Sequence, residues 1–138
     1  MKVIKAWWWR EHTNLGDVLT PYIVGRLSEM KCKHIGIKWT DAIIYILKHI
    51  YSGTPINWSI LWPVYFQEPE YILGVGSILH NGGKKSIAWG CGFLLPNGKF
   101  IGKQAVAVRG FLSADRLLRQ GFPQVGVVGD PALLLPLV

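Results

Sequence analysis

The stretch from Gln104 to Pro136 constrains the fold of this chain most strongly, because it predicts a complete strand–helix–strand unit. Ala105 to Val108 is a run of small and β-branched apolar residues, which is typical of a strand buried on both faces of a parallel sheet. A helix is predicted next, with Ser113 as its N-cap and Gly121 just past its end. Val125 to Val128 predicts the second strand. Such a unit favours an open α/β sheet that binds ligands at the carboxyl ends of its strands.

Charged residues follow both strands of this unit. Arg109 comes directly after the first strand, and Asp130 follows the second. A charge at the end of a buried strand is costly without a partner. Two interpretations of Arg109 stay open: it contacts an anionic ligand, or it pairs with Asp130. The helix between the strands is predicted to bury a face made of Leu112, Leu117 and Leu118.

The rest of the chain alternates strand-like and helix-like patterns and contains no internal repeat. We therefore predict one α/β, Rossmann-like domain over residues 1–138, with a mostly parallel sheet and helices on both faces. Pro21 is expected in the first turn of the first helix. The predicted strands are Lys2–Trp9, His34–Trp39, Tyr71–Val75 and Ser86–Trp89, and the helices are capped at Asp17 or Thr20 and near Thr40–Asp41.

The sequence argues against a membrane-spanning or a secreted protein. Half of the 138 residues are hydrophobic, yet no uninterrupted apolar run reaches the ~18 residues of a membrane span. The first residues lack the apolar segment of a signal peptide, so we expect a cytoplasmic protein, with the inner face of the membrane left open. Cys32 and Cys91 lie far apart without metal-like spacing, which favours reduced thiols.

The net charge of +7 comes from 15 basic and 8 acidic residues, and the basic residues are scattered. Nucleic-acid binding would favour a concentrated basic stripe, so no nucleic acid is expected as a partner. The positive field suits phosphorylated donors, acidic sugars or an anionic membrane surface. The alternative, that the charge only aids solubility, is equally open.

Aromatic residues gather in two places whose role the sequence leaves open. Trp7, Trp8 and Trp9 are adjacent, and because strand side chains alternate they cannot all face one core. Burial or a subunit contact is favoured over a sugar-stacking platform. The segment 52–69 combines prolines with aromatic residues and is either a packed connection or a flap that faces a partner.

Four short motifs occur in order along the chain: Asn14-Leu15-Gly16-Asp17, Gly74-Val75-Gly76-Ser77-Ile78-Leu79, Trp89-Gly90-Cys91-Gly92, and Val108-Arg109-Gly110 together with Gly129-Asp130-Pro131. Together they resemble the polysaccharide pyruvyl transferase family. The chain departs from the family pattern at Phe111, where the family normally has a proline.

The resemblance implies a fold and an activity. Residues 1–138 would correspond to the N-terminal half of a two-domain, GT-B-like transferase, with the C-terminal half absent and this chain alone inactive or incomplete. The family moves pyruvyl from phosphoenolpyruvate to two sugar hydroxyls as a ketal, in the synthesis of exopolysaccharide or cell-surface glycan. The resemblance implies no cofactor and no metal, with phosphoenolpyruvate as donor and a glycan or lipid-linked sugar as acceptor.

The resemblance and the predicted strand ends together select candidate site residues. A helix-capping role for Asp17 is favoured over catalysis, and a lone histidine such as His80 is more often an ordinary surface residue. The candidates are Arg109, Asn14, Gly16, Gly76, Ser77 and Asp130 for substrate binding, and His80 and Asp17 for catalysis.

Two other functions remain as alternatives: half of a nucleotide-sugar glycosyltransferase, and a non-catalytic association module that uses its aromatic face. Fold alone does not choose among them. Peripheral membrane association and a homo-oligomer are also left open, and the sequence does not predict the acceptor sugar or its linkage.

Overall fold

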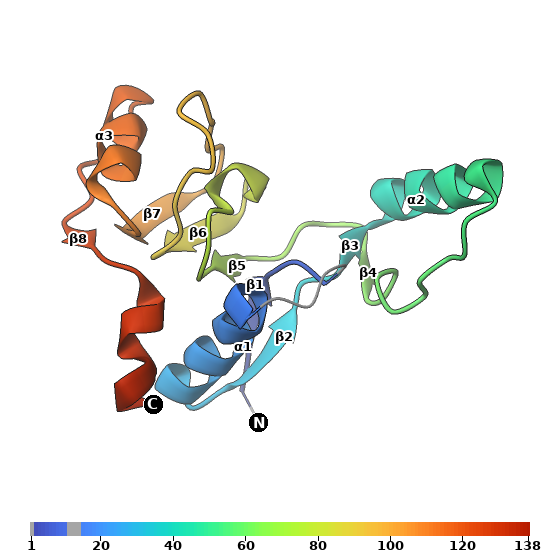
Figure 1. The fold of residues 1–138 in the computed structure, drawn as a ribbon, viewed down its shortest axis with the longest axis horizontal. Helices are drawn as coiled ribbons and strands as arrows, with labels where there is room; N and C mark the ends of the chain where they lie inside the picture. The colour runs from blue at the N-terminus through green and yellow to red at the C-terminus, as the bar shows by residue number, and fades with distance from the viewer. Residues whose placement is uncertain (1, 11–14) are drawn as a thin grey trace.

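The centre of the protein is a six-stranded parallel sheet with the order β2-β1-β5-β6-β7-β8 (Figure 1). The structure is a computed structural model and describes residues 2–10 and 15–138. Each neighbouring pair in this sheet runs parallel, which confirms the predicted α/β fold. The strands are β1 (Val3–Trp7), β2 (Lys31–His34), β5 (Tyr71–Leu73), β6 (Ser86–Trp89), β7 (Gln104–Val108) and β8 (Val127–Val128).

Helices cover both faces of the sheet, as predicted. Val24 of α1 (Leu15–Ser28) and Ile72 of β5 line the same hollow. Leu117 of α3 (Phe111–Arg119) belongs to the same core cluster as Leu73 of β5. Because successive strand residues point to opposite faces, α1 and α3 lie on opposite sides of β5.

The direction of the strand order changes between β1 and β5. From β1 the chain moves outward to β2, whereas β5 to β8 follow one another toward the other edge. In open α/β sheets, ligands bind outside the carboxyl ends of the strands at such a switch point. The topology therefore singles out the loops that follow β1 and β5.

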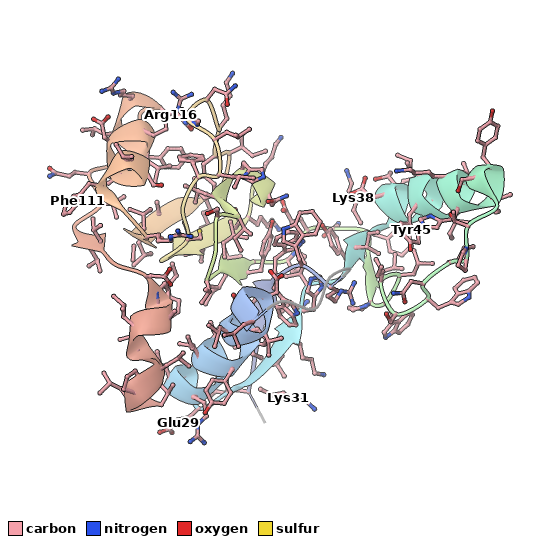
Figure 2. The ribbon with its side chains drawn as sticks, in the orientation of Figure 1. Glu29, Lys31, Lys38, Tyr45, Phe111 and Arg116 are labelled. Carbon is pink, nitrogen blue, oxygen red and sulfur yellow. The ribbon has the colours of Figure 1, made fainter. Side chains whose placement is uncertain are left out.

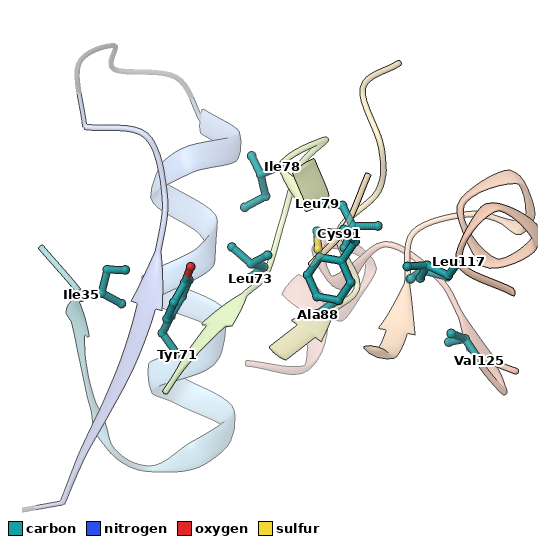
Figure 3. Packing of buried hydrophobic residues seen from close by; sticks show 11 residues of the cluster. Ile35, Tyr71, Leu73, Ile78, Leu79, Ala88, Cys91, Leu117 and Val125 are labelled. Atoms are coloured by element: carbon teal, nitrogen blue, oxygen red, sulfur yellow. The ribbon is translucent and has the colours of Figure 1, made fainter. Parts of the chain in front are cut away.

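The hydrophobic core lies on the α3 side of the central strands (Figure 3). Leu73, Ala88 and Leu117 are completely buried there. The prediction of a three-leucine face on α3 is wrong, because Leu112 and Leu118 are exposed and only Leu117 enters the core. The side of α3 that packs inward carries Ser113, Ala114 and Leu117 instead. The cluster consists of Ile35, Tyr71, Leu73, Ile78, Leu79, Ala88, Cys91, Phe100, Val108, Leu117 and Val125.

A second, two-stranded sheet carries α2 (Trp39–Ser52) away from the main sheet (Figure 1). It pairs β3 (Ile37–Lys38) with β4 (Val64–Tyr65) in parallel. The predicted single strand over His34–Trp39 is therefore wrong. Gly36 divides it: this residue has φ +92°, and a Cβ there would lie 1.9 Å from the carbonyl oxygen of Pro63.

The structure leaves both alternatives for the segment 52–69 open, because Leu61 is buried whereas Trp58, Trp62 and Phe66 are exposed. The Arg10 guanidinium donates hydrogen bonds to the backbone carbonyls of Ser59, Ile60 and Trp62, which holds the turn against the end of β1. Tyr45 lies on the side of α2 that faces this segment (Figure 2), and its hydroxyl accepts a hydrogen bond from the Asn57 N–H at 3.4 Å.

Three predicted helix starts are wrong. α1 begins at Leu15, so Pro21 lies in its second turn, where it removes one backbone hydrogen bond. α2 begins at Trp39 after Lys38, and no side chain caps it. α3 begins at Phe111 after Gly110, so Ser113 lies inside the first turn.

The remaining elements are two 3₁₀ helices. η1 (Leu79–Asn81) follows β5, and η2 (Pro131–Leu137) lies beside α1 (Figure 1).

The end of α3 agrees with prediction, since Gly121 follows the C-cap residue Gln120 and has φ +89°. Within residues 2–10 and 15–138, no helix has the length and apolar character needed to cross a membrane.

Candidate functional site: a glycine-rich rim with one arginine

The loops that leave β5, β6, β7 and β8 lie side by side along one edge of the sheet. Backbone hydrogen bonds continue past the strand ends: Gly92 N–H donates to Gly76 O at 3.0 Å, and Arg109 N–H donates to Cys91 O at 3.0 Å. Gly129 N–H donates to Val108 O at 2.8 Å. The loops are thus held in register. Together, these loops after β5, β6, β7 and β8 form what we call the rim.

Close approach of other elements requires glycine at two points of this rim. A Cβ on Gly74 would lie 2.8 Å from Cγ2 of Thr20, whose hydroxyl accepts a hydrogen bond from the Val75 N–H at 3.0 Å. Gly90 has φ +88°, and a Cβ there would lie 2.1 Å from Cγ of Pro131. Glycine therefore lets α1 and η2 pack directly against the ends of β5 and β6.

Arg109 joins three of these loops. Its Nη1 donates a hydrogen bond to the Ser77 hydroxyl at 3.1 Å, and its Nε lies 3.5 Å from Oδ2 of Asp130. The other oxygen of Asp130, Oδ1, accepts a hydrogen bond from the Ala132 N–H at 3.0 Å and so caps η2. The structure thus contains the ion pair between Arg109 and Asp130, which was one of the two interpretations of Arg109. The arginine side chain is still 49 % exposed, which leaves its guanidinium open to a ligand.

An open pocket of about 390 Å³ lies in front of Arg109. Gly110 precedes α3 at its edge, so the unpaired N–H groups of the helix start face the same region. Phe111 and Leu112 are strongly exposed and form apolar walls; Figure 2 labels Phe111 at the base of α3. A guanidinium beside a helix N-terminus favours an anion. The geometry suits a small ligand with a phosphate or carboxylate group.

The structure brings four of the candidate site residues together and separates others. Gly76, Ser77, Arg109 and Asp130 meet at the rim. His80 is exposed on η1, whose turn buries Leu79 instead, and it does not line the Arg109 pocket.

Two further candidates belong to the start of α1. Gly16 and Asp17 lie in its first turn, with Asp17 buried. They are one turn before Thr20, which contacts the loop after β5. Asn14 lies outside the described residues.

Sequence reasoning missed the role of Ser113. It is buried in the first turn of α3, and its hydroxyl accepts a hydrogen bond from the Phe93 N–H at 3.1 Å. Gly92 makes room for it, since a Cβ there would lie 3.2 Å from the Ser113 oxygen. Ser113, Gly92 and Phe93 all line the pocket, so this contact shapes its wall. The sequence signal that could have pointed to this contact is the pair of glycines, Gly90 and Gly92, on either side of Cys91.

The three tryptophans lie near the carboxyl end of β1 and have different environments. Trp7 packs against the core cluster, Trp8 meets the His34 ring edge to face at 4.7 Å, and Trp9 is exposed. Gly36 N–H donates to His34 Nδ1 at 2.8 Å, so the neutral ring carries its proton on Nε2 and donates it to Trp8 O at 3.0 Å. Burial, and secondarily the charge of Arg10, lower the pKa of His34 to about 4. His34 is thus a neutral structural residue near pH 7.

Cys32 and Cys91 are free thiols, and burial raises the pKa of Cys91 to about 12. In the part of the chain that the structure describes, no group of three or more His, Cys, Asp or Glu side chains could hold a metal ion.

Comparison with known proteins assigns the chain to a family. The family model described as polysaccharide pyruvyl transferase matches residues 14–137, which include every loop of the rim. Searches of curated proteins and of solved structures give no match. The matched range covers nearly the whole chain, and the chain therefore belongs to the polysaccharide pyruvyl transferase family.

Proposed function

We propose that this protein takes part in the transfer of pyruvyl from phosphoenolpyruvate to two hydroxyls of a sugar, in the synthesis of exopolysaccharide or cell-surface glycan. The family assignment supports a transferase of this kind. The observation that carries the donor assignment is Arg109, which stands at the start of α3, bound to Ser77 and Asp130 and open to a pocket. The donor has a phosphate and a carboxylate, the two groups that arginine binds best.

The reaction balances without an oxidant or a cofactor. An acid adds a proton to C3 of the donor, and the oxygen of one sugar hydroxyl bonds to C2 and loses its proton to a base. The bond from C2 to the phosphate oxygen then breaks, and phosphate leaves with the electron pair. The second hydroxyl bonds to C2 and loses its proton, which gives a cyclic ketal and inorganic phosphate.

The residues around the Arg109 pocket are suited to anion binding. Arg109 and the N–H groups at the start of α3 would hold the phosphate or carboxylate, and would favour the charge that develops as phosphate leaves. Asp130 and Ser77 would position the guanidinium. Among the described residues that line this pocket, none is a histidine or a carboxylic acid. Roles for Asp17 and His80 in proton transfer therefore remain proposals.

Binding of phosphoenolpyruvate tests the assignment. Isothermal titration of the full chain should detect the donor, and Arg109→Ala should weaken it roughly tenfold or more, because a hydrogen bond to a charged group contributes about 1.5–3 kcal/mol. Arg119→Ala is the matched control, since Arg119 pairs with Asp115 at 2.9 Å on the exposed side of α3. Equal affinity in both variants would remove Arg109 from the site. Tighter binding of UDP-glucose than of phosphoenolpyruvate would favour a glycosyltransferase instead.

A further inference from the structure

A second hollow, of about 520 Å³, lies apart from the Arg109 pocket. Trp7 of β1 and Tyr71 of β5 form its base on the main sheet, and Tyr65 of β4 closes it from the small sheet. Lys38, labelled in Figure 2 at the base of α2, marks its outer end. The hollow therefore lies beside β1 and β5, and it extends to Gly83 and Lys84, which precede β6.

One fixed hydrogen-bond acceptor in this hollow is the carboxylate of Glu68. Its Oε1 accepts a hydrogen bond from the Tyr71 hydroxyl at 3.2 Å, and its Oε2 accepts one from the Lys85 N–H at 3.2 Å. Glycine at position 83 makes room for it, since a Cβ there would lie 1.7 Å from Oε1. Each oxygen can accept a further hydrogen bond, so the carboxylate is positioned with capacity left for a ligand.

A second acceptor is Oδ1 of Asn81. This atom is buried, and it has no hydrogen-bond partner within residues 2–10 and 15–138. Leaving such an atom unpaired destabilises the fold, so each case calls for an explanation. Because Asn81 lines the hollow, a ligand that donates a hydrogen bond would satisfy it.

The remaining lining fits an uncharged ligand with one apolar face. Trp7, Tyr65 and Tyr71 supply aromatic surface. The charged groups at the rim have both signs, with Lys38 and Lys84 offset by Asp41 and Glu68. An ionised carboxylate or a phosphate monoester dianion has no proton to donate to Glu68 or Asn81, whereas a hydroxyl has. Aromatic rings with carboxylate and amide acceptors match the C–H faces and hydroxyls of a sugar ring.

We propose that this hollow, lined by Trp7, Tyr65, Glu68, Tyr71 and Asn81, binds a neutral sugar unit through two hydroxyls that donate to Glu68 and to Oδ1 of Asn81. The inference goes beyond the proposed function, because the hollow shares no lining residue with the Arg109 pocket, where the sugar that receives pyruvyl must meet the donor. Sugar binding is measured independently of donor binding.

The test is NMR of the full chain with ¹⁵N-labelled tryptophan. The Trp7 indole signal is assigned by its absence from the spectrum of the Trp7→Phe variant. Methyl glycosides of glucose, galactose and mannose are titrated one at a time into the millimolar range. At least one should shift the Trp7 indole signal, while inorganic phosphate should shift the backbone amides of Gly110 and Phe111 and not Trp7. If none of the three sugars moves the Trp7 signal, the proposal is overturned, whatever phosphate does.

A matched pair of asparagine variants separates binding from folding. Asn81→Ala removes the unpaired acceptor, so it should weaken sugar binding roughly tenfold without lowering the melting temperature. Asn97→Ala is the control, since Asn97 is exposed in the loop after Phe93. Unchanged sugar affinity in Asn81→Ala overturns the proposal.

Glu68→Gln and Glu70→Gln form a second pair. Glu70 is two residues away but bound to Lys103 outside the hollow. Only Glu68→Gln should reduce the sugar affinity, and an equal effect of the two variants contradicts the assignment. Loss of phosphoenolpyruvate binding in Arg109→Ala with sugar binding retained would show that the two sites are separate.

Discussion

The guanidinium of Arg109 donates a hydrogen bond to the hydroxyl of Ser77 across 3.1 Å, although 31 residues separate the two in sequence. The bond connects the loop after β7 with the loop after β5. Asp130, on the loop after β8, holds the same guanidinium from the other side. Three loops thus share one cation at the carboxyl edge of the sheet, which orients it toward the pocket before any ligand arrives.

Replacing Arg109 by lysine should separate charge from geometry. An ammonium keeps the charge but cannot reach Ser77 and Asp130 at once with a planar group. We expect weaker phosphoenolpyruvate binding, intermediate between the unaltered chain and Arg109→Ala. The free energy of unfolding should change by less than about 1 kcal/mol, because half-exposed ion pairs contribute little. Titration calorimetry and urea unfolding measure the two effects, and full affinity in the lysine variant would contradict the role of the planar group.

The sequence was sufficient to predict the part of the fold in which local pattern and tertiary environment agree. Gln104 to Val128 forms the expected strand, helix and strand, because apolar β-branched runs suit a buried parallel sheet and Gly121 suits the end of a helix. The glycines after β5 and β6 marked the rim for the same reason. At these positions the backbone conformation or a close neighbour requires glycine.

Features set by distant contacts could not be predicted. Gly36 splits a run that alternates like one strand because the carbonyl of Pro63 occupies the space beside it. Ser113 has the pattern of an N-cap, but its hydroxyl is bound to the Phe93 N–H from another loop. Asn81 carries no sequence signal at all, since its significance depends on the hollow that Trp7 and Tyr71 create.

Substituting Gly90 by alanine should strongly destabilise the protein. The new Cβ would meet the ring of Pro131 at 2.1 Å, and the φ of +88° is unfavourable for any residue with a side chain. Overpacking and backbone strain together cost about 2–4 kcal/mol. Gly126→Ala is the control, because a Cβ there meets nothing within 4 Å. Urea unfolding should show a large loss only for Gly90→Ala, and equal losses would refute the close contact between β6 and η2.

His34 should make stability depend on pH. Burial lowers its pKa from 6.5 to about 4, so the unfolded chain binds more protons than the folded chain between these values. The stabilisation is therefore complete above pH 6.5 and is lost as the pH falls toward 4. The loss is on the order of 2 kcal/mol, after allowance for partial contact with water. His34→Gln should show a smaller decrease in unfolding free energy between pH 7.5 and pH 4.5, and an identical decrease would contradict the assignment.

The outward side of α2 should tolerate charge. Ile44 is 62 % exposed and Leu47 is 60 % exposed, whereas Ala42 on the inner side is 7 % exposed. Ile44→Lys and Leu47→Lys should change the free energy of unfolding by no more than about 0.5 kcal/mol, as expected for surface positions. Ala42→Lys should cost several times more, because it buries a charge. Large losses at Ile44 and Leu47 would show that another surface covers this side of α2 in solution.

Tyr71 connects the stability of the fold to the second hollow. Its hydroxyl accepts a hydrogen bond from the Gly83 N–H at 2.7 Å and donates one to Glu68, and burial raises its pKa well above the usual value of 10. The group therefore stays protonated, and Tyr71→Phe would leave the Gly83 N–H without its acceptor. We expect a loss of about 1–3 kcal/mol in urea unfolding. Tyr51→Phe, at a fully solvated position on α2, should have no effect. Because Glu68 would also lose its donor, Tyr71→Phe should weaken sugar binding as well; reduced stability with full sugar affinity would limit Tyr71 to a structural role.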